Sequence, residues 1–194
     1  MSDDQQQEKA APGDLEHIRL LVNTRDLETG EESIGDPEAL AGWLSQRGLL
    51  TAGERLTDAD LRQAQSLREA LRKLLLANNG APLDPEAVDA LNAAGKSAEL
   101  VVRFDSGGGA ALAPVRPGVD AALGRLLAVV FQSMADGTWR RLKACPDHDC
   151  EWAFYDWSKN RSGTWCDMAV CGNRAKARAY RERRRRAPAP SSHA

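Results

Sequence analysis

The stretch Cys145-Pro-Asp-His-Asp-Cys150, followed by Cys166-Asp-Met-Ala-Val-Cys171, contains all four cysteines of this 194-residue chain. Four residues lie inside each pair, and fifteen separate the pairs. Each pair can hold one edge of a metal ion, and the intervening loop is long enough to form a hairpin that brings the second pair round. The spacing therefore predicts a closed tetrahedral site with one structural zinc ion. A disulfide framework is the alternative, although nothing in the sequence marks the chain for an oxidising compartment.

Four thiolates complete the shell of a zinc ion, so His148, inside the first pair, is expected to be a surface residue. Basic groups such as Lys143, Arg174 or Lys176 would moderate the negative charge of the cluster. A catalytic zinc needs an open position, which four cysteines do not leave. Upstream of the cysteines the only histidine is His17, and no paired carboxylates stand out. We therefore expect that the chain is not an enzyme.

The composition of the chain changes near Gly137. Six of the ten aromatic residues fall between positions 139 and 165, whereas the upstream part is rich in Ala, Leu, Glu and Arg. Residues 1–138 carry 13 Lys and Arg against 22 Asp and Glu, and residues 139–194 carry 13 against 6, so an anion-binding surface is expected near the C-terminus. We predict four segments: a disordered N-terminus (1–13), an α-rich domain (14–137), a finger with a basic helix (138–186) and a disordered tail (187–194).

The α-rich domain contains three helices whose starts have a capping acid or hydroxyl and whose ends have Gly or Asn. The starts are at Asp36, Thr57 and Asp84, and the ends at Gly48, Asn79 and Gly95. Apolar residues from Val119 to Met134, including Phe131, recur at spacings of three and four and predict a further amphipathic helix. Segments 100–104 and 111–115 flank a glycine-rich loop and predict a β-hairpin. The expected fold class is α+β, mostly α.

From Gly172 to Arg186 the chain has strong helix formers and no proline. At 100° per residue the arginines at 174, 178, 181 and 185 form one basic stripe, with Lys176 on the opposite side. Glu182 is the only acid after Asp167, so the repulsion along this helix is uncompensated unless a polyanion lies alongside. The alternative is a frayed basic tail that only aids solubility.

The sequence contains no run of about 18 apolar residues, and its first nine residues are acidic and glutamine-rich. A secretory signal would instead be basic and then apolar. We expect neither a membrane span nor export, and a cytoplasmic location.

The segment Trp165-Cys-Asp-Met-Ala-Val-Cys-Gly-Asn-Arg-Ala-Lys176 resembles the CGNR zinc finger family, together with the upstream residues Cys145, Cys150, Phe154, Asp156, Ser158 and Asn160. The resemblance covers roughly residues 142–185. It implies a DNA-binding zinc module, with the four cysteines as ligands and Gly172-Asn173-Arg174 opening the basic helix. Asp167 and Gly163 stand where many members have Ser and Arg, which removes one phosphate contact.

The upstream part is similar to the ABATE domain, which accompanies this finger in stress-induced bacterial transcription regulators. The similarity lies in Leu21-Val-Asn-Thr-Arg25 and later in Trp43-Leu44 and Gly48-Leu49. It implies a regulatory domain, and a small-molecule effector is one alternative for its ligand.

We interpret the chain as a bacterial-type DNA-binding regulator with a sensory or scaffolding N-terminal domain and a finger that contacts DNA. The expected nucleic-acid contacts are Lys159, Arg161, Asn173, Arg174, Lys176, Arg178, Arg181 and Arg185. Arg174 and Arg178 are the leading candidates for base contacts, because they lie nearest the rigid metal site. Alternatives are an RNA-binding module and a zinc-dependent protein adaptor. Exposure of Trp152, Trp157 and Trp165 would favour RNA, since unpaired bases stack on aromatic rings.

Overall fold

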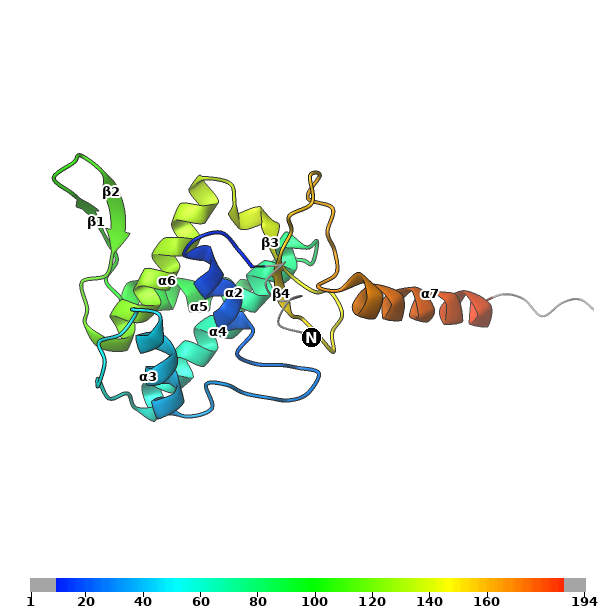
Figure 1. The fold of residues 1–194 in the computed structure, drawn as a ribbon, viewed down its shortest axis with the longest axis horizontal. Coiled ribbons are helices and arrows are strands. Elements are labelled where there is room, and N and C mark those ends of the chain that lie inside the picture. Colours follow the sequence, from blue (N-terminus) through cyan, green and yellow to red (C-terminus); the bar gives the residue numbers. More distant parts are fainter. Residues whose placement is uncertain (1–9, 187–194) are drawn as a thin grey trace, which may run out of the picture.

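A computed structural model of the chain describes residues 10–186 (Figure 1). The helices are α2 (Leu15–Val22), α3 (Pro37–Gln46), α4 (Asp58–Asn78), α5 (Pro85–Ser97), α6 (Gly118–Ala135) and α7 (Asn173–Arg186). Two antiparallel hairpins pair β1 (Val101–Phe104) with β2 (Ala110–Ala113) and β3 (Leu142–Ala144) with β4 (Ala153–Tyr155). A 3₁₀ turn (Trp139–Arg141) precedes β3, and a π-helical turn (Met168–Gly172) precedes α7. The predicted fold class, α+β and mostly α, is confirmed.

The predicted helix starts are confirmed by their caps. Asp36 and Asp84 accept hydrogen bonds from backbone N–H groups in the first turns of α3 and α5, and Thr57 forms a reciprocal capping box at the start of α4. The expected end of α5 at Gly95 is wrong, since the helix continues to Ser97. A glycine inside a helix is unfavourable by only about 1 kcal/mol, so packing against α4 and α6 can outweigh it.

Helices α2, α4, α5 and α6 pack against one another and enclose the core. On α6 the buried stripe runs through Val119, Leu123, Leu126 and Val130. The expectation that Phe131 and Met134 share this face is wrong: their side chains are 56% and 48% exposed. At 100° per residue Phe131 lies about 110° round the helix from the centre of the stripe.

Helix α6 alone among the described helices is long and apolar enough to cross a membrane by length and composition. It also carries Asp120 and Arg125, and it buries its apolar stripe against α2 and α5. A core helix of this kind passes the same test, so α6 does not indicate a membrane protein.

The hairpin β3–β4 packs directly onto α4 and α2. Leu142, Ala144, Ala153 and Tyr155 belong to the same buried cluster as the apolar residues of the helices. One hydrophobic core therefore crosses the composition boundary at Gly137, and the first part of the finger is a layer of the helical domain. Figure 1 shows the result: helices α2 to α6 form one body, from which β1–β2 projects at one end and α7 at the other.

The predicted disordered segments have different outcomes. Residues 1–9 and 187–194 lie outside the described residues. Residues 10–13 are ordered against the body, so a disordered segment reaching residue 13 is too long. Ala11 is buried, and the carbonyl of Ala10 accepts a hydrogen bond of 3.0 Å from the Trp157 indole.

Candidate metal centre and basic helix

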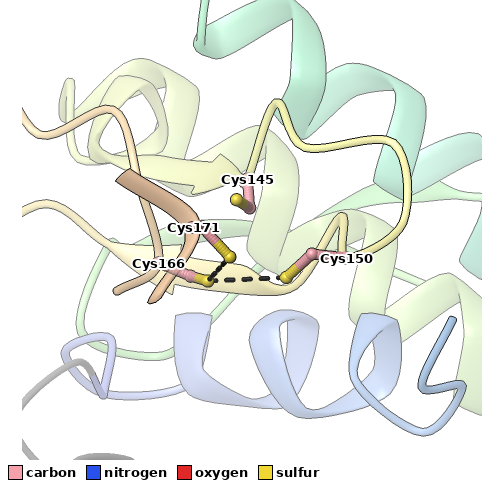
Figure 2. A group of neighbouring side chains, drawn as sticks. All are labelled: Cys145, Cys150, Cys166 and Cys171. Carbon is pink, nitrogen blue, oxygen red and sulfur yellow. Dashed lines mark hydrogen bonds between the residues drawn. The ribbon is translucent and has the colours of Figure 1, made fainter. Parts of the chain in front are cut away.

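The four cysteines converge on one point although three different segments carry them (Figure 2). Cys145 follows β3, Cys150 ends the first loop, Cys166 precedes the π-helical turn and Cys171 lies within it. The four Sγ atoms all lie within 4.8 Å of one another, and all four residues are buried. The Sγ–Sγ distance is 3.5 Å between Cys150 and Cys166 and 3.6 Å between Cys166 and Cys171.

These distances fit a tetrahedral ion. With metal–sulfur bonds near 2.3 Å, the edge of a tetrahedron is about 3.8 Å, close to the separations observed. The four thiols do not readily ionise together. A hydrogen bond from the Cys150 thiol lowers the pKa of Cys145, and the same hydrogen bond raises the pKa of Cys150. The same crowding by Cys145 raises the pKa of Cys166. A cation at the centre would allow all four to ionise, so the residues present form a metal site.

Aromatic residues surround the cysteines as a small second core. Phe154 is buried with the four cysteines, and Trp152 and Trp165 pack half-buried against the cluster. His148 is a surface residue, as predicted, with its side chain 77% exposed. The centre therefore holds four sulfur ligands, and no imidazole belongs to it within residues 10–186.

A buried ion pair organises the loop between the two cysteine pairs. The Lys143 ammonium lies 2.7 Å from Asp156 Oδ2 and also donates to the carbonyls of Arg161 and Gly163. Burial alone would raise the pKa of Asp156, but the hydrogen bonds from Lys143 and Ser158 outweigh it and lower the pKa. The hydrogen bonds of Lys143 Nζ among the described residues go to this loop, and its effect on the thiolate charge stays a prediction.

The backbone of Gly163, in the same loop, lies close to the carboxylate of Asp156. Its backbone N–H donates to Asp156 Oδ2 at 2.9 Å. A Cβ atom at position 163 would lie 2.7 Å from Asp156 Oδ1, so only glycine fits this geometry. The departure from the family pattern at this position thus has a local structural reason.

The Gly172-Asn173-Arg174 segment joins the metal centre to α7. Gly172 is buried in the π-helical turn, directly after the ligand Cys171. The Asn173 amide donates to the carbonyl of Ala169 at 2.9 Å and ties the π-helical turn to the helix. Asp167 caps this turn by accepting from Ala169 and Val170. Asn173 thus has a structural partner here, and its contact with nucleic acid stays a prediction.

Arg174 and Arg178 point back toward the first cysteine pair. Arg174 Nε lies 3.3 Å and Arg178 Nη2 lies 3.0 Å from the carboxylate of Asp147, whose side chain is fully buried. Arg174 also donates to Cys171 Sγ at 3.2 Å and to both carboxylate oxygens of Glu28. Glu28 and Cys171 together raise the pKa of Arg174. Of the three basic groups expected near the thiolates, Arg174 is the one that reaches them.

The pairing with Asp147 and Glu28 is the functional feature that sequence reasoning missed. The stripe on α7 is compensated at its start by acids from elsewhere in the chain, not by acids on the helix. The remaining predicted contacts are all on exposed surface, and their contact with nucleic acid stays a prediction: Lys159 and Arg161 on the loop, and Lys176, Arg181 and Arg185 on α7. Figure 1 shows α7 leaving the body as a single projecting helix.

The structure thus defines a metal-binding finger with a basic helix, packed onto a helical domain. Residues 141–184 match the family described as "CGNR zinc finger", and residues 20–137 match ABATE, described as "Putative stress-induced transcription regulator". The chain belongs to the ABATE family and carries a CGNR zinc finger. Both resemblances noted from the sequence are confirmed. No curated protein gives a significant match to the chain.

Proposed function

We propose that this chain is a DNA-binding transcription regulator whose finger is folded by one zinc ion and whose helix α7 contacts the phosphate backbone. The observation that carries the proposal is the projection of a helix with one acid and eight basic residues directly from a four-cysteine centre. Phosphate contacts dominate the affinity of proteins for duplex DNA, and a helix of this kind suits them.

The zinc ion has a structural role in this proposal. Cys145, Cys150, Cys166 and Cys171 would hold it and leave no position for water or substrate, so we propose that the chain is not an enzyme. Metal binding would supply the folding free energy of the two cysteine loops. Thiolate ligands persist in a reducing compartment, which supports a cytoplasmic location.

The aromatic residues support duplex DNA over single-stranded RNA. Trp152 and Trp165 pack against the cysteines and are not free to stack on bases. Trp157 is 59% exposed, but its indole N–H is bonded to Ala10 and its ring lies 4.7 Å from that of Tyr155. Recognition of unpaired bases generally needs several free aromatic faces.

Arg174 and Arg178 have a different proposed role from the other basic residues of α7. Because both guanidinium groups pair with the buried carboxylate of Asp147, we assign them first to orienting the helix. Lys176, Arg181 and Arg183–Arg186 are exposed and would meet phosphates without breaking an ion pair of the described structure.

The test compares binding of the zinc-loaded protein to duplex DNA and to single-stranded RNA of the same sequence across a salt series. We expect tighter binding to the duplex. Replacing Arg183, Arg184, Arg185 and Arg186 by Ala should weaken binding to all sequences alike and make the log–log salt slope shallower by just under one unit for each phosphate that is no longer neutralised. The matched control removes four exposed arginines of the helical domain, with Ala in place of Arg55, Arg62, Arg103 and Arg116. Tighter binding to RNA, or equal effects of the two variants, would overturn the assignment.

A further inference from the structure

The segment that carries Cys150 into β4 is held by side chains of the helical domain. Asn23, just after α2, pairs with Ala153 through both of its amide atoms: its Nδ2 donates to the Ala153 carbonyl at 2.9 Å, and its Oδ1 accepts from the Ala153 N–H at 2.7 Å. The Asn23 amide therefore forms with the free edge of β4 the pair of backbone hydrogen bonds that a neighbouring strand would form.

Arg72 on α4 makes a second attachment, two residues earlier in the finger. Its Nη1 donates to the Glu151 carbonyl at 3.0 Å, and its Nη2 donates to the Val22 carbonyl at 2.8 Å. Its Nε donates to Glu69 at 2.9 Å. The Arg72 side chain is only 1% exposed, so one buried guanidinium joins α4, the end of α2 and the finger.

Glu151 is a residue that needs such support. It directly follows the ligand Cys150, and its φ of 45° lies in the left-handed region, which costs a non-glycine residue of order 1 kcal/mol or more. The bond from Arg72 to the Glu151 carbonyl and the pairing of Asn23 with Ala153 both fix the backbone on the C-terminal side of Glu151. Together they keep the backbone in the conformation that turns the Cys150 sulfur toward the other three.

We infer that Arg72 and Asn23 of the helical domain are positioning residues for the metal centre, so that the metal affinity of the finger depends on side chains of the helical domain. The inference rests on metal binding at the four cysteines, as proposed above, and does not depend on nucleic-acid binding. Partners outside the ligand shell of metal sites commonly change metal affinity by 10-fold to 100-fold, although most of those studied hold the ligand itself.

The test measures the affinity of the full chain for Co²⁺ by absorption, and for Zn²⁺ by competition with a chromogenic chelator. Variants are Arg72→Gln, Arg72→Lys and Asn23→Ser, with Arg62→Gln as the matched control, since Arg62 is an exposed arginine on the same helix. We expect about a 10-fold loss of affinity for each of the three variants and none for the control. Arg72→Lys separates geometry from charge, because lysine keeps the charge but lacks the planar fork of donors.

A rescue experiment distinguishes positioning from general destabilisation. Glu151→Gly removes the cost of the left-handed conformation, so adding it to Arg72→Gln should recover part of the lost affinity. Circular dichroism before and after metal addition establishes that each variant is folded. If Arg72→Gln does not fold, Asn23→Ser with Glu151→Gly makes the same comparison at a half-buried residue.

The outcomes separate the two proposals. A wild-type chain that binds no Zn²⁺ would contradict the proposed function. A wild-type chain that binds Zn²⁺, with Arg72 and Asn23 variants that bind it equally well, would overturn the inference alone. Full affinity in Arg72→Lys, or no recovery on adding Glu151→Gly, would also overturn it, because charge or overall stability would then explain the loss.

Discussion

Arg174 on α7 forms a bidentate ion pair with Glu28, a residue of the loop after α2, through Nη1–Oε1 at 2.8 Å and Nη2–Oε2 at 3.0 Å. A carboxylate in this arrangement occupies the donors that an arginine uses to bind a phosphate. The loop of the helical domain and a nucleic acid would therefore compete for the same guanidinium. The helical domain thus contacts the proposed DNA-binding helix at the residue nearest the metal centre.

Replacing Glu28 by Gln should raise the affinity for duplex DNA. Glutamine keeps the size of the side chain but removes the charge that opposes a phosphate at Arg174. The pair is partly exposed and exposed pairs contribute about 0–1 kcal/mol, so the expected gain is at most about 5-fold. Equilibrium binding at low and moderate salt measures it.

Glu31→Gln is the matched control for this change. It removes one negative charge from the same loop, but the ion pairs of Arg174 within residues 10–186 are with Glu28 and Asp147. An equal gain in both variants would mean that only net charge matters and that the pair with Glu28 is not a competitor.

Asp147→Asn should loosen the start of α7 while leaving the metal in place. The fully buried carboxylate of Asp147 holds both Arg174 and Arg178, and an amide cannot compensate two guanidinium groups. The expected loss is about 1–3 kcal/mol of local stability. Hydrogen exchange should become faster in the first two turns of α7, with Zn²⁺ content unchanged. Unchanged exchange there would show that Asp147 does not anchor the helix, and Asp149→Asn, at an exposed site, serves as the control.

The cysteine spacing, the helix caps and the basic stripe could be predicted because each is a local pattern. The partners that fix the site are far away in sequence: Glu28 and Arg174 are 146 positions apart, and Asn23 and Ala153 are 130 positions apart. Asp147 lies inside the first cysteine pair, but its contact with α7 depends on the direction in which the helix leaves the π-helical turn. No periodicity or spacing encodes that direction, so these contacts emerge only from the packed structure.

Shared packing also explains why the domain boundary is clearer in composition than in space. The apolar residues of β3 and β4 carry no mark of which neighbour buries them. They could equally have completed a core within the finger or, as observed, a face of the helical domain.

Glu69 should make the stability of the helical domain depend on pH. It accepts hydrogen bonds from Arg68 at 2.8 Å and Arg72 at 2.9 Å. Burial acts to raise its pKa, but the two arginines outweigh burial and the pKa is lowered. A carboxylate with a lowered pKa stabilises the fold above its unfolded pKa of about 4.3, and this contribution is lost as pH falls through the folded pKa.

Urea unfolding of the wild type and of Glu69→Gln between pH 7 and pH 3 tests this expectation. The variant should be less stable at pH 7, and the difference should close in acid. Because Glu69 is bonded to Arg72, both proteins are unfolded with a chelator present, so that loss of metal in acid does not contribute to the difference between them. A difference that stays constant with pH would contradict an ionic contribution.

Loss of the metal should unfold the cysteine loops and α7 but leave the β3–β4 hairpin folded. In Cys166→Ser, or after chelation, we expect hydrogen exchange to become fast in the two cysteine loops and α7 but to stay slow in β3 and β4. Leu142 and Tyr155 are 0% and 4% exposed and are buried against the helices, so their burial does not need the metal. Leu142→Ala supplies the converse, since truncating a buried leucine costs about 2–5 kcal/mol and should lower the stability of the helices and the hairpin together. If β3 and β4 lose protection with the cysteine loops while the helices keep theirs, the finger folds as a separate module and the shared core does not couple the two.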